Sequence, residues 1–332
     1  MKTYPPAHTA RLLAPFMSLL LLAATPANAG DVFYYGVQKG QYYLQSSLDA
    51  AELAPDNPYV FEAFVEGTGD GAIEEVYLTK PGSSPSTIPG SGTSYFAQVV
   101  FSSLNSLNSL YRSGSYRFQI YSENDIYTET FVNLSGDTYP PAPHVTNYTA
   151  AQAINPAAAF TVRWEPFTGG TTDDTIELYV YDNGGSVVYT DSGLDGTVTS
   201  DTIPANTLSP GTTYPAEVIF WKSVDFLLDP GSGAFGLSFY YKTTQFTVTT
   251  TGSSTNSPPP TISSPQIQLN GQFQLHIEGV AGRSYRVEST TDFSSWTQLQ
   301  TIIAPVGGGL DFLDNQPLSA SARFYRVVLL PP

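Results

Sequence analysis

The stretch "FTVRWEPFTGGTTDDTIELYV", from Phe160 to Val180, shows the sequence pattern that repeats along this chain. Apolar and polar residues alternate on both sides of a turn rich in glycine, threonine and aspartate. Because β-branched and aromatic residues at a period of two are typical of half-buried strands, the stretch predicts two strands joined by a turn. The same pattern recurs through most of the chain and predicts an all-β protein.

A second motif follows at "LSPGTTY", from Leu208 to Tyr214. A tyrosine near the start of a late strand, bonded back across a corner, is typical of immunoglobulin-type sandwiches. With Trp164 closing an early strand and "ELYVYD" forming the next, residues 141–250 resemble a fibronectin type III domain. The resemblance implies a β-sandwich and no particular activity, because such folds carry many functions.

The preceding segment repeats these landmarks. "FEAFVEGTGDGAIEEVYL" begins at Phe61, and "LYRSGSY" ends at Tyr116, 55 residues later; Phe160 and Tyr214 are 54 residues apart. The position that corresponds to the tryptophan is Val65. We expect residues 30–140 to form a related sandwich.

Proline-rich segments divide the chain. "YPPAPHVTN" (139–147) cannot pair as a central strand, and "TTTGSSTNSPPPTISSP" (249–265) has the composition of a linker. The predicted organisation is three tandem immunoglobulin/fibronectin-III-like β-sandwich domains after a signal peptide: 1–29 signal peptide, 30–140 and 141–250 sandwiches, 251–260 Ser/Thr/Pro linker, 261–332 small C-terminal sandwich.

The last segment contains "GVAGRSYRVESTTDFSSWTQL", residues 279–299. We expect a hairpin there, with Tyr285, Val287, Phe324 and one face of Trp296 in a small core. The segment resembles a C-terminal module of exported proteins of Verrucomicrobia and Planctomycetes, as does the mature chain from "YYGVQKGQYYLQSS" onward. That resemblance implies a location outside the cytoplasm and no specific activity.

The N-terminus has the pattern of a secretory signal peptide. Lys2 and Arg11 precede the short apolar run "FMSLLLLAA", and "ANA" at 27–29 fits a cleavage site. The run is too short for a stable membrane anchor, and no other apolar run of spanning length follows. We expect a secreted or extracytoplasmic protein with no transmembrane segment in the mature chain.

Composition narrows the classes of partner. Without Lys2 and Arg11, the chain keeps 11 basic and 29 acidic residues, a balance of −18 that disfavours nucleic acid and anionic lipid. The chain has no cysteine, which excludes disulfides, thiol chemistry and cysteine-ligated metal sites. Acidity serves solubility outside the cell, or alternatively calcium binding.

Few residues point to catalysis, and we expect no cofactor. His144 and His276 lie in different predicted domains, without the neighbours of a triad or zinc motif. Paired carboxylates can hydrolyse glycosides, but Asp173-Asp174 lies in a turn, and Glu74-Glu75 point to opposite faces of a strand. We interpret these as turn and surface charges.

Three aspartate-rich turns are weak candidates for calcium: "DNGG" beginning at Asp182, "DSGLDG" containing Asp191 and Asp195, and "DFLDN" (311–315). None has the spacing of an EF-hand loop. Asp-Asn-Gly-Gly is also a favourable hairpin turn, so turn formation is the preferred interpretation.

The second sandwich carries an insertion after its corner tyrosine. Tyr116 precedes Phe131 by 15 residues, whereas Tyr214 precedes Phe246 by 32. We expect this extra chain to form a loop whose apolar residues either bind a partner or pack on the neighbouring domain. The candidate patch is Trp221, Phe226, Leu227, Leu228, Phe235 and Tyr240.

Three functions remain open at this point. The first is a non-enzymatic exported scaffold, adhesion or interaction protein. The second is a carbohydrate-binding protein that stacks sugars on a row of exposed aromatics, such as Trp221, Tyr240, Tyr241 or Trp296. The third is a glycoside-active enzyme with two facing carboxylates. The partner is left open, with a protein and a polysaccharide as the two candidates.

Overall fold

A computed structural model describes residues 30–69, 73–229, 233–252, 260–268, 272–305, 307–315 and 322–330. The predicted signal peptide and most of the predicted linker lie outside the described residues. The chain divides into two compact units: the first ends at Thr251, and the second consists of the residues from Gly252 onward together with Ser209–Gly211.

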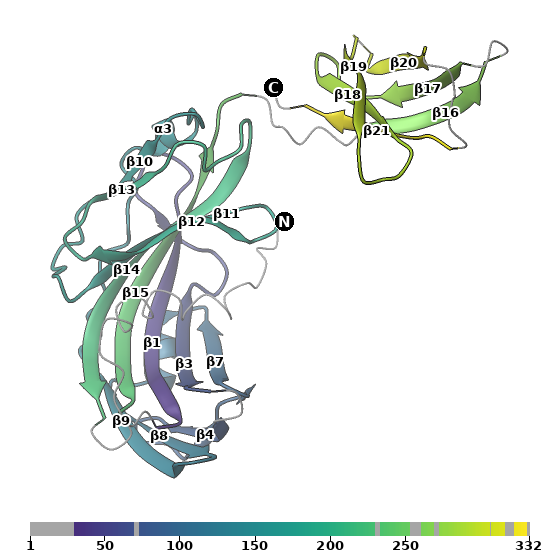
Figure 1. The fold of residues 1–332 in the computed structure, drawn as a ribbon. Coiled ribbons are helices and arrows are strands. Elements are labelled where there is room, and N and C mark those ends of the chain that lie inside the picture. Colours follow the sequence, from purple (N-terminus) through teal and green to yellow (C-terminus); the bar gives the residue numbers. More distant parts are fainter. Residues whose placement is uncertain are drawn as a thin grey trace. The chain divides into compact units, whose positions relative to one another are not determined.

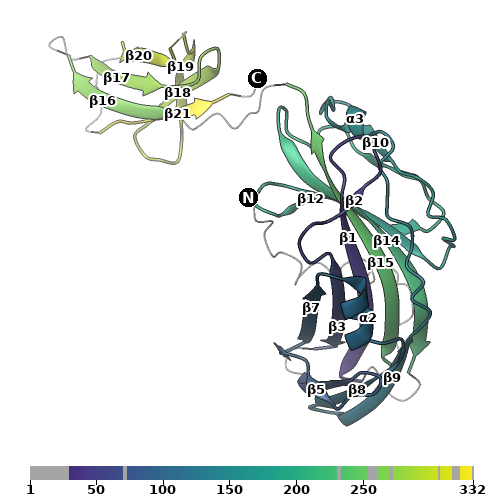
Figure 2. The ribbon, with the colours of Figure 1, turned by 180° about the vertical axis from the view of Figure 1, so that it is seen from behind.

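One large sheet forms the frame of the first unit (Figures 1 and 2). Its strand order is β12-β11-β14-β15-β1-β3-β7-β6, and β2 pairs with β1. The strands are β1 (Val32–Leu44), β2 (Glu52–Leu53), β3 (Tyr59–Gly67), β6 (Gly90–Ser91), β7 (Ser94–Phe101), β11 (Thr175–Tyr181), β12 (Val187–Asp195), β14 (Thr213–Leu228) and β15 (Phe235–Thr249).

The two N-terminal segments share this sheet because β1 pairs with β15 in parallel, from Tyr34↔Phe235 to Leu44↔Gln245. The other pairs of the sheet are antiparallel. The predicted insertion after Tyr214 is therefore strand rather than loop: it lengthens β14 and β15 until β15 reaches along β1. Strands from both sides of residue 140 therefore lie in one sheet.

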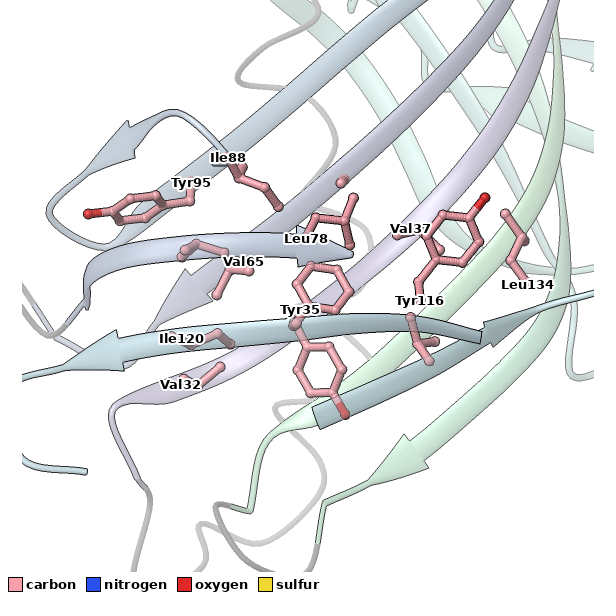
Figure 3. Close-up of a cluster of buried hydrophobic side chains, with 14 of the residues drawn as sticks. Val32, Tyr35, Val37, Val65, Leu78, Ile88, Tyr95, Tyr116, Ile120 and Leu134 are labelled. Carbon is pink, nitrogen blue, oxygen red and sulfur yellow. The ribbon is translucent and has the colours of Figure 1, made fainter. Parts of the chain in front are cut away.

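The first core lies between one half of the large sheet and a four-stranded sheet of order β5-β4-β8-β9. Figure 3 shows Val37, Tyr116 and Leu134 near one another in this core, with the Tyr35 ring directed away from them. The helix α2 (Leu104–Leu110) adds Leu107, and its N-cap Ser103 accepts a bond from the backbone N–H of Ser106. The strands are β4 (Ile73–Thr79), β5 (Ser86–Thr87), β8 (Gly114–Ser122) and β9 (Ile126–Leu134).

The second core lies on the same side of the large sheet. Here β11, β14 and β15 pack against β10 (Phe160–Arg163) and β13 (Ser200–Ile203), with α3 (Tyr148–Ala151) beside them. Trp164 is buried in this core, and its indole Nε1 donates to the carbonyl of Val198 at 2.9 Å. The two strands expected on either side of the turn at 168–174 are β10 and β11, and they belong to two different sheets.

The corner motif of the first segment has its expected bond. Tyr116 is fully buried at the start of β8, and its hydroxyl donates to the carbonyl of Arg112 at 2.8 Å. Tyr214 begins the corresponding late strand, β14, and is also buried.

The second unit is a small sandwich. One sheet has the order β16-β17-β20 and the other β19-β18-β21. Tyr285 and Val287 are buried as expected, whereas Phe324 is 39 % exposed and its neighbour Tyr325 packs on the core. The strands are β16 (Thr261–Ile267), β17 (Phe273–Glu278), β18 (Ser284–Thr290), β19 (Thr297–Ile303), β20 (Gly309–Asp314) and β21 (Phe324–Leu329).

The fold is thus all-β and built from β-sandwiches. Among the described residues, no helix has the length and apolar character needed to cross a membrane.

We predict that Tyr116→Phe lowers the free energy of unfolding by about 1 kcal/mol, because the hydrogen bond from the buried Tyr116 to the Arg112 carbonyl is lost. Urea unfolding of residues 30–332, followed by circular dichroism, measures the change. Tyr127→Phe is the matched control, since Tyr127 is exposed and its hydroxyl bonds only to side chains. Equal effects of the two changes would contradict the corner interpretation.

Candidate functional site

The face of the large sheet opposite to both cores carries a third cluster of buried aromatic and apolar side chains. On β15, Tyr240, Phe246 and Val248 point into the two cores, whereas Phe239 and Tyr241 point the other way. We call this cluster the aromatic face: Phe33, Tyr34, Tyr42, Val60, Phe64, Phe96, Tyr179, Tyr181, Ile219, Trp221, Phe235, Leu237, Phe239 and Tyr241.

All these residues come from strands of one sheet: β1, β3, β7, β11, β14 and β15. The two cores, in contrast, draw their side chains from two sheets each. Among the described residues, no second layer contributes to the aromatic face. Ten of these side chains are nevertheless buried, each with 8% or less of its surface exposed, so the rings pack on one another.

Two glycines of β1 make room for the rings. A Cβ atom added to Gly40 would lie 2.1 Å from the Tyr241 ring, and one added to Gly36 would lie 2.6 Å from the Phe64 ring. Each ring therefore lies directly over the β1 backbone. Since these two glycines are four residues apart, both fall on the same face of the strand.

The rings form one contiguous group around Tyr241. Its ring centroid lies 4.4 Å from that of Trp221 and 6.2 Å from that of Tyr42. On β11, Tyr179 and Tyr181 stack with an interplanar angle of 3°. Such groups present negatively polarised ring faces to their surroundings.

Three buried glutamates lie within the aromatic face: Glu62 on β3, Glu177 on β11 and Glu217 on β14. Glu177 stands opposite Ile219 and Glu217 opposite Tyr179, so these two carboxylates are diagonal neighbours on adjacent strands. Carboxylates are rarely buried without partners, because removal from water disfavours their charge.

Glu62 is held by neutral donors. Its Oε2 accepts from the Gln38 amide at 2.7 Å and from the Tyr241 hydroxyl at 2.9 Å, and its Oε1 accepts from the Gln98 amide at 2.7 Å. Glu217 accepts a short hydrogen bond from Tyr181. These bonds fix the positions of both carboxylates.

Glu177 differs from the other two. Its side-chain atom Oε1 is buried without a hydrogen-bond partner, and so is the hydroxyl of neighbouring Tyr179. Burial raises the pKa of Glu177 to about 8, with a further contribution from the charge of Glu217; the Trp221 indole and the Tyr179 hydroxyl, which lie close to the carboxyl group, act in the opposite direction. No described lysine or arginine forms an ion pair with Glu177 or Glu217.

The three glutamates line a cavity of about 30 Å³. This volume holds about two water molecules and excludes a sugar ring. A group that enters it meets carboxylates and ring faces, both of which favour a positive charge. The remaining lining residues are Tyr42, Tyr179, Tyr181, Ile219, Trp221, Tyr241 and Thr243.

The residues of the predicted patch do not lie together. Trp221 is buried in the aromatic face, and Tyr240 is fully buried on the opposite side of β15, in the first core. Phe226, Leu227 and Leu228 are exposed near the end of β14, and Phe235 is half-buried. Trp221, Tyr240 and Tyr241 therefore form no exposed row of rings for sugar stacking.

The aspartates considered as calcium ligands accept hydrogen bonds from backbone N–H groups of their own turns instead. Asp182 accepts from the N–H groups of Gly184 and Ser186, Asp191 from that of Gly193, and Asp195 from that of Thr197. Within the described parts of the chain, no group of three or more acidic or histidine side chains is arranged to hold a metal ion.

The other candidate acids have structural surroundings. Asp174 is buried, accepts from the N–H of Thr171 and forms an ion pair with Lys222 at 2.7 Å. Its neighbour Asp173 is exposed, as are Glu74 and Glu75. None of these pairs two carboxylates across a described cavity.

The two histidines and Trp296 lie outside the aromatic face. His144 bonds to the carbonyl of Leu48, and His276 contacts Asp311 and Glu278 on the surface of the second unit. The Arg326 guanidinium lies 4.1 Å from the centroid of the half-buried Trp296 ring.

Sequence reasoning overlooked Glu62, Glu177 and Glu217, although each carries a signal. They stand in "VFEAFV", "TIELYV" and "PAEVIF", single acids within otherwise apolar strands. In each of these strands the residues around the glutamate are apolar on both faces, which indicates a strand that is buried on both sides. An acid is rare in such a strand.

No protein-family model and no curated protein matches the chain. Solved structures that match include a biofilm-associated protein BSP domain, with 12% identity, a TM-score of 0.20, and coverage of 95% of this chain and 67% of that one. The FN1–FN3 domains of chicken CNTN1 match with 12% identity, a TM-score of 0.20, and coverage of 89% and 93%. A tetra-tandem repeat of a large adhesion protein matches with 9% identity, a TM-score of 0.22, and coverage of 89% and 74%. No conclusion about function follows from likenesses at this level.

We predict that Gly40→Ala destabilises the first unit by about 1–3 kcal/mol, because the new methyl group overlaps the Tyr241 ring. Urea unfolding monitored by tryptophan fluorescence measures this change. Gly69→Ala is the control, since a Cβ at Gly69 meets nothing within 4 Å. A Gly40→Ala protein as stable as the control would contradict the packing of Tyr241 over β1.

We also predict that Glu177→Gln reduces the pH dependence of stability. With a folded pKa of about 8 against an ordinary 4.5, Glu177 keeps its proton longer in the folded than in the unfolded chain. Its contribution therefore makes the wild type less stable as pH rises from about 4.5 to 8, whereas glutamine does not titrate.

Thermal unfolding at several pH values between 4 and 9 measures this effect. Glu165→Gln, at an exposed position, serves as the control and should leave the profile unchanged. Parallel profiles for the wild type and Glu177→Gln would show that Glu177 titrates at its ordinary pKa.

Proposed function

We propose that this is an exported, non-enzymatic interaction protein, and that its first unit binds a partner protein on the aromatic face through a protonated amine. The β-sandwiches serve as the scaffold that presents this face. The observation that carries the proposal is the group of buried glutamates beside a small cavity, with one oxygen of Glu177 lacking a hydrogen-bond partner.

An amine fits this chemistry for two reasons. A lysine ammonium offers three donors, which match the carboxylate oxygens and tyrosine hydroxyls that line the cavity. Its charge also interacts favourably with tryptophan and tyrosine faces, and more strongly where water is excluded. The compact ammonium group suits a cavity of about 30 Å³.

The surroundings of the cavity favour a protein as the source of the amine. Phe226 pairs with Leu237 and Leu228 with Phe235, so all four side chains lie on the same side of the sheet as the aromatic face. Phe226 is 53 % exposed and Leu228 59 % exposed. A partner with apolar side chains around a lysine would cover these residues while the ammonium enters the cavity.

Charge supports the same choice of partner. The chain carries a net charge of −16, which attracts basic partners over a distance. We infer export from the N-terminal signal pattern, which fits a protein that meets its partners outside the cytoplasm.

A titration with methylammonium chloride tests the proposal. We predict that residues 30–332 bind it with a change in tryptophan fluorescence, because Trp221 lines the cavity. Binding a cation favours the ionised carboxylate, so affinity should rise by up to about tenfold between pH 7 and 9 as Glu177 loses its proton.

The controls separate amine binding from other causes. Methanol, a neutral molecule of similar size, should not bind, and Glu177→Gln should abolish the response to methylammonium while exposed Glu74→Gln retains it. Absence of saturable methylammonium binding would overturn the amine proposal. Binding of soluble oligosaccharides in its place would favour the carbohydrate-binding alternative.

A further inference from the structure

A buried lysine in the first core has no role in the aromatic face. Lys39 lies on β1 with its side chain fully buried among the residues of that core. On β1, Val37 and Lys39 point to the same side, opposite to Gly40 and Tyr42. A lysine in such a place is unusual, because its charge is costly to remove from water.

Two side chains from distant parts of the sequence meet the amine. The Nζ atom lies 3.0 Å from the Oδ1 atom of Asn108 on α2 and 3.2 Å from the Oδ1 atom of Asp137, just after β9. Because Oδ1 of Asn108 is bonded to the side-chain carbonyl carbon, the amine lies against an amide that it can attack. Contact of this kind holds a nucleophile and an electrophile in position to react.

Burial acts on Lys39 in the direction of the neutral, nucleophilic amine, and the Asp137 carboxylate beside it can accept the proton. Burial lowers the pKa of Lys39, while the Asp137 carboxylate opposes this effect. The tyrosines nearby, Tyr116, Tyr139 and Tyr240, have pKa values raised by burial and stay uncharged. A desolvated lysine amine is the form that acts as a nucleophile in enzymes.

Asp137 is held in place to move the protons. The Tyr240 hydroxyl lies 3.1 Å from Oδ1 of Asp137 and also accepts from the Asp137 backbone N–H at 3.1 Å. The carboxylate contacts the attacking amine directly and is 40 % exposed, so its proton exchanges with solvent. These are the properties of a general base and acid.

We propose that Lys39 and Asn108 join in an amide cross-link within the first unit. The Nζ–Cγ bond forms and the Cγ–Nδ2 bond of Asn108 breaks. Asp137 takes a proton from the attacking amine and gives one to the departing nitrogen, which leaves as ammonia. No oxidant or reductant is needed, and Asp137 returns to its initial state.

The cross-link would fasten β1 to α2 across the first core, between residues 69 positions apart in the sequence. In a chain without cysteine, it would supply the covalent restraint that disulfides give other exported proteins. The proposal is independent of the function proposed for the aromatic face, which lies on the other side of β1.

Intact-mass spectrometry of purified residues 30–332 tests the proposal, because the cross-linked chain is lighter than its sequence mass by one ammonia. Trypsin should also fail to cleave after Lys39 in the denatured protein. The variants Lys39→Met, Asn108→Ala and Asp137→Asn should each have the full mass of their sequence. Asn108→Asp should lose water instead of ammonia and reach the same final mass as the cross-linked wild type.

These variants keep the test decisive even where one of them folds poorly, because the wild-type mass alone decides whether ammonia is lost. Succinimide formation at Asn183-Gly184 or Asn270-Gly271 would also release ammonia, but it would persist in Lys39→Met and would not block cleavage after Lys39. A wild-type protein with its full sequence mass, cleaved by trypsin after Lys39, would overturn the proposal.

Discussion

The parallel pairing of β1 with β15 is the constraint on which the first unit depends. It joins a strand at the start of the described chain to a strand from the second segment, and so fuses two half-sheets into one. Because side chains alternate along a strand, the pairing also fixes what each side of the sheet receives. One side carries both cores, and the other carries the aromatic face.

The length of β15 follows from this double role. Its first half presents Tyr240 to the first core, and its second half presents Phe246 and Val248 to the second core. A strand that served one sandwich would need only half this length. The long β14–β15 hairpin is therefore a bridge, and its apolar residues pack against β1 and β11 as well as against each other.

Much of the local structure could be predicted from the sequence. The strands around Trp164, the corner at Tyr116 and the hairpin at Tyr285 all follow from periodicity and turn residues. The placement of Phe324 was wrong because Phe324 shares its side of the strand with Arg326, whereas Tyr325, Val327 and Leu329 form the apolar side that packs on the core. The pairing of β1 with β15 has no local signal, so the sequence predicts a loop where the structure has an extended hairpin.

The candidate site was harder to predict for the same reason. Glu62, Glu177 and Glu217 lie far apart in the sequence, and only the order of the strands brings them to one cavity. Each of these glutamates is a single acid inside an apolar strand. An acid in such a strand indicates a buried site only when both faces of the strand are known to be buried, because otherwise it can face solvent. The sequence analysis places Trp221 and Tyr240 in one patch, whereas the structure puts them on opposite sides of the large sheet. Tyr240 faces the first core because side chains alternate along β15.

The pairing of β1 with β15 also determines the order in which the chain can fold. Tyr35 on β1 can pair with Gly236 on β15 only after residue 236 has been synthesised. One edge of β1 therefore stays unpaired until nearly the whole first unit has emerged. Contacts between such distant residues form slowly, and an open strand edge can recruit other chains in the meantime. A chain of this design would benefit from a chaperone that covers β1 until the β14–β15 hairpin arrives.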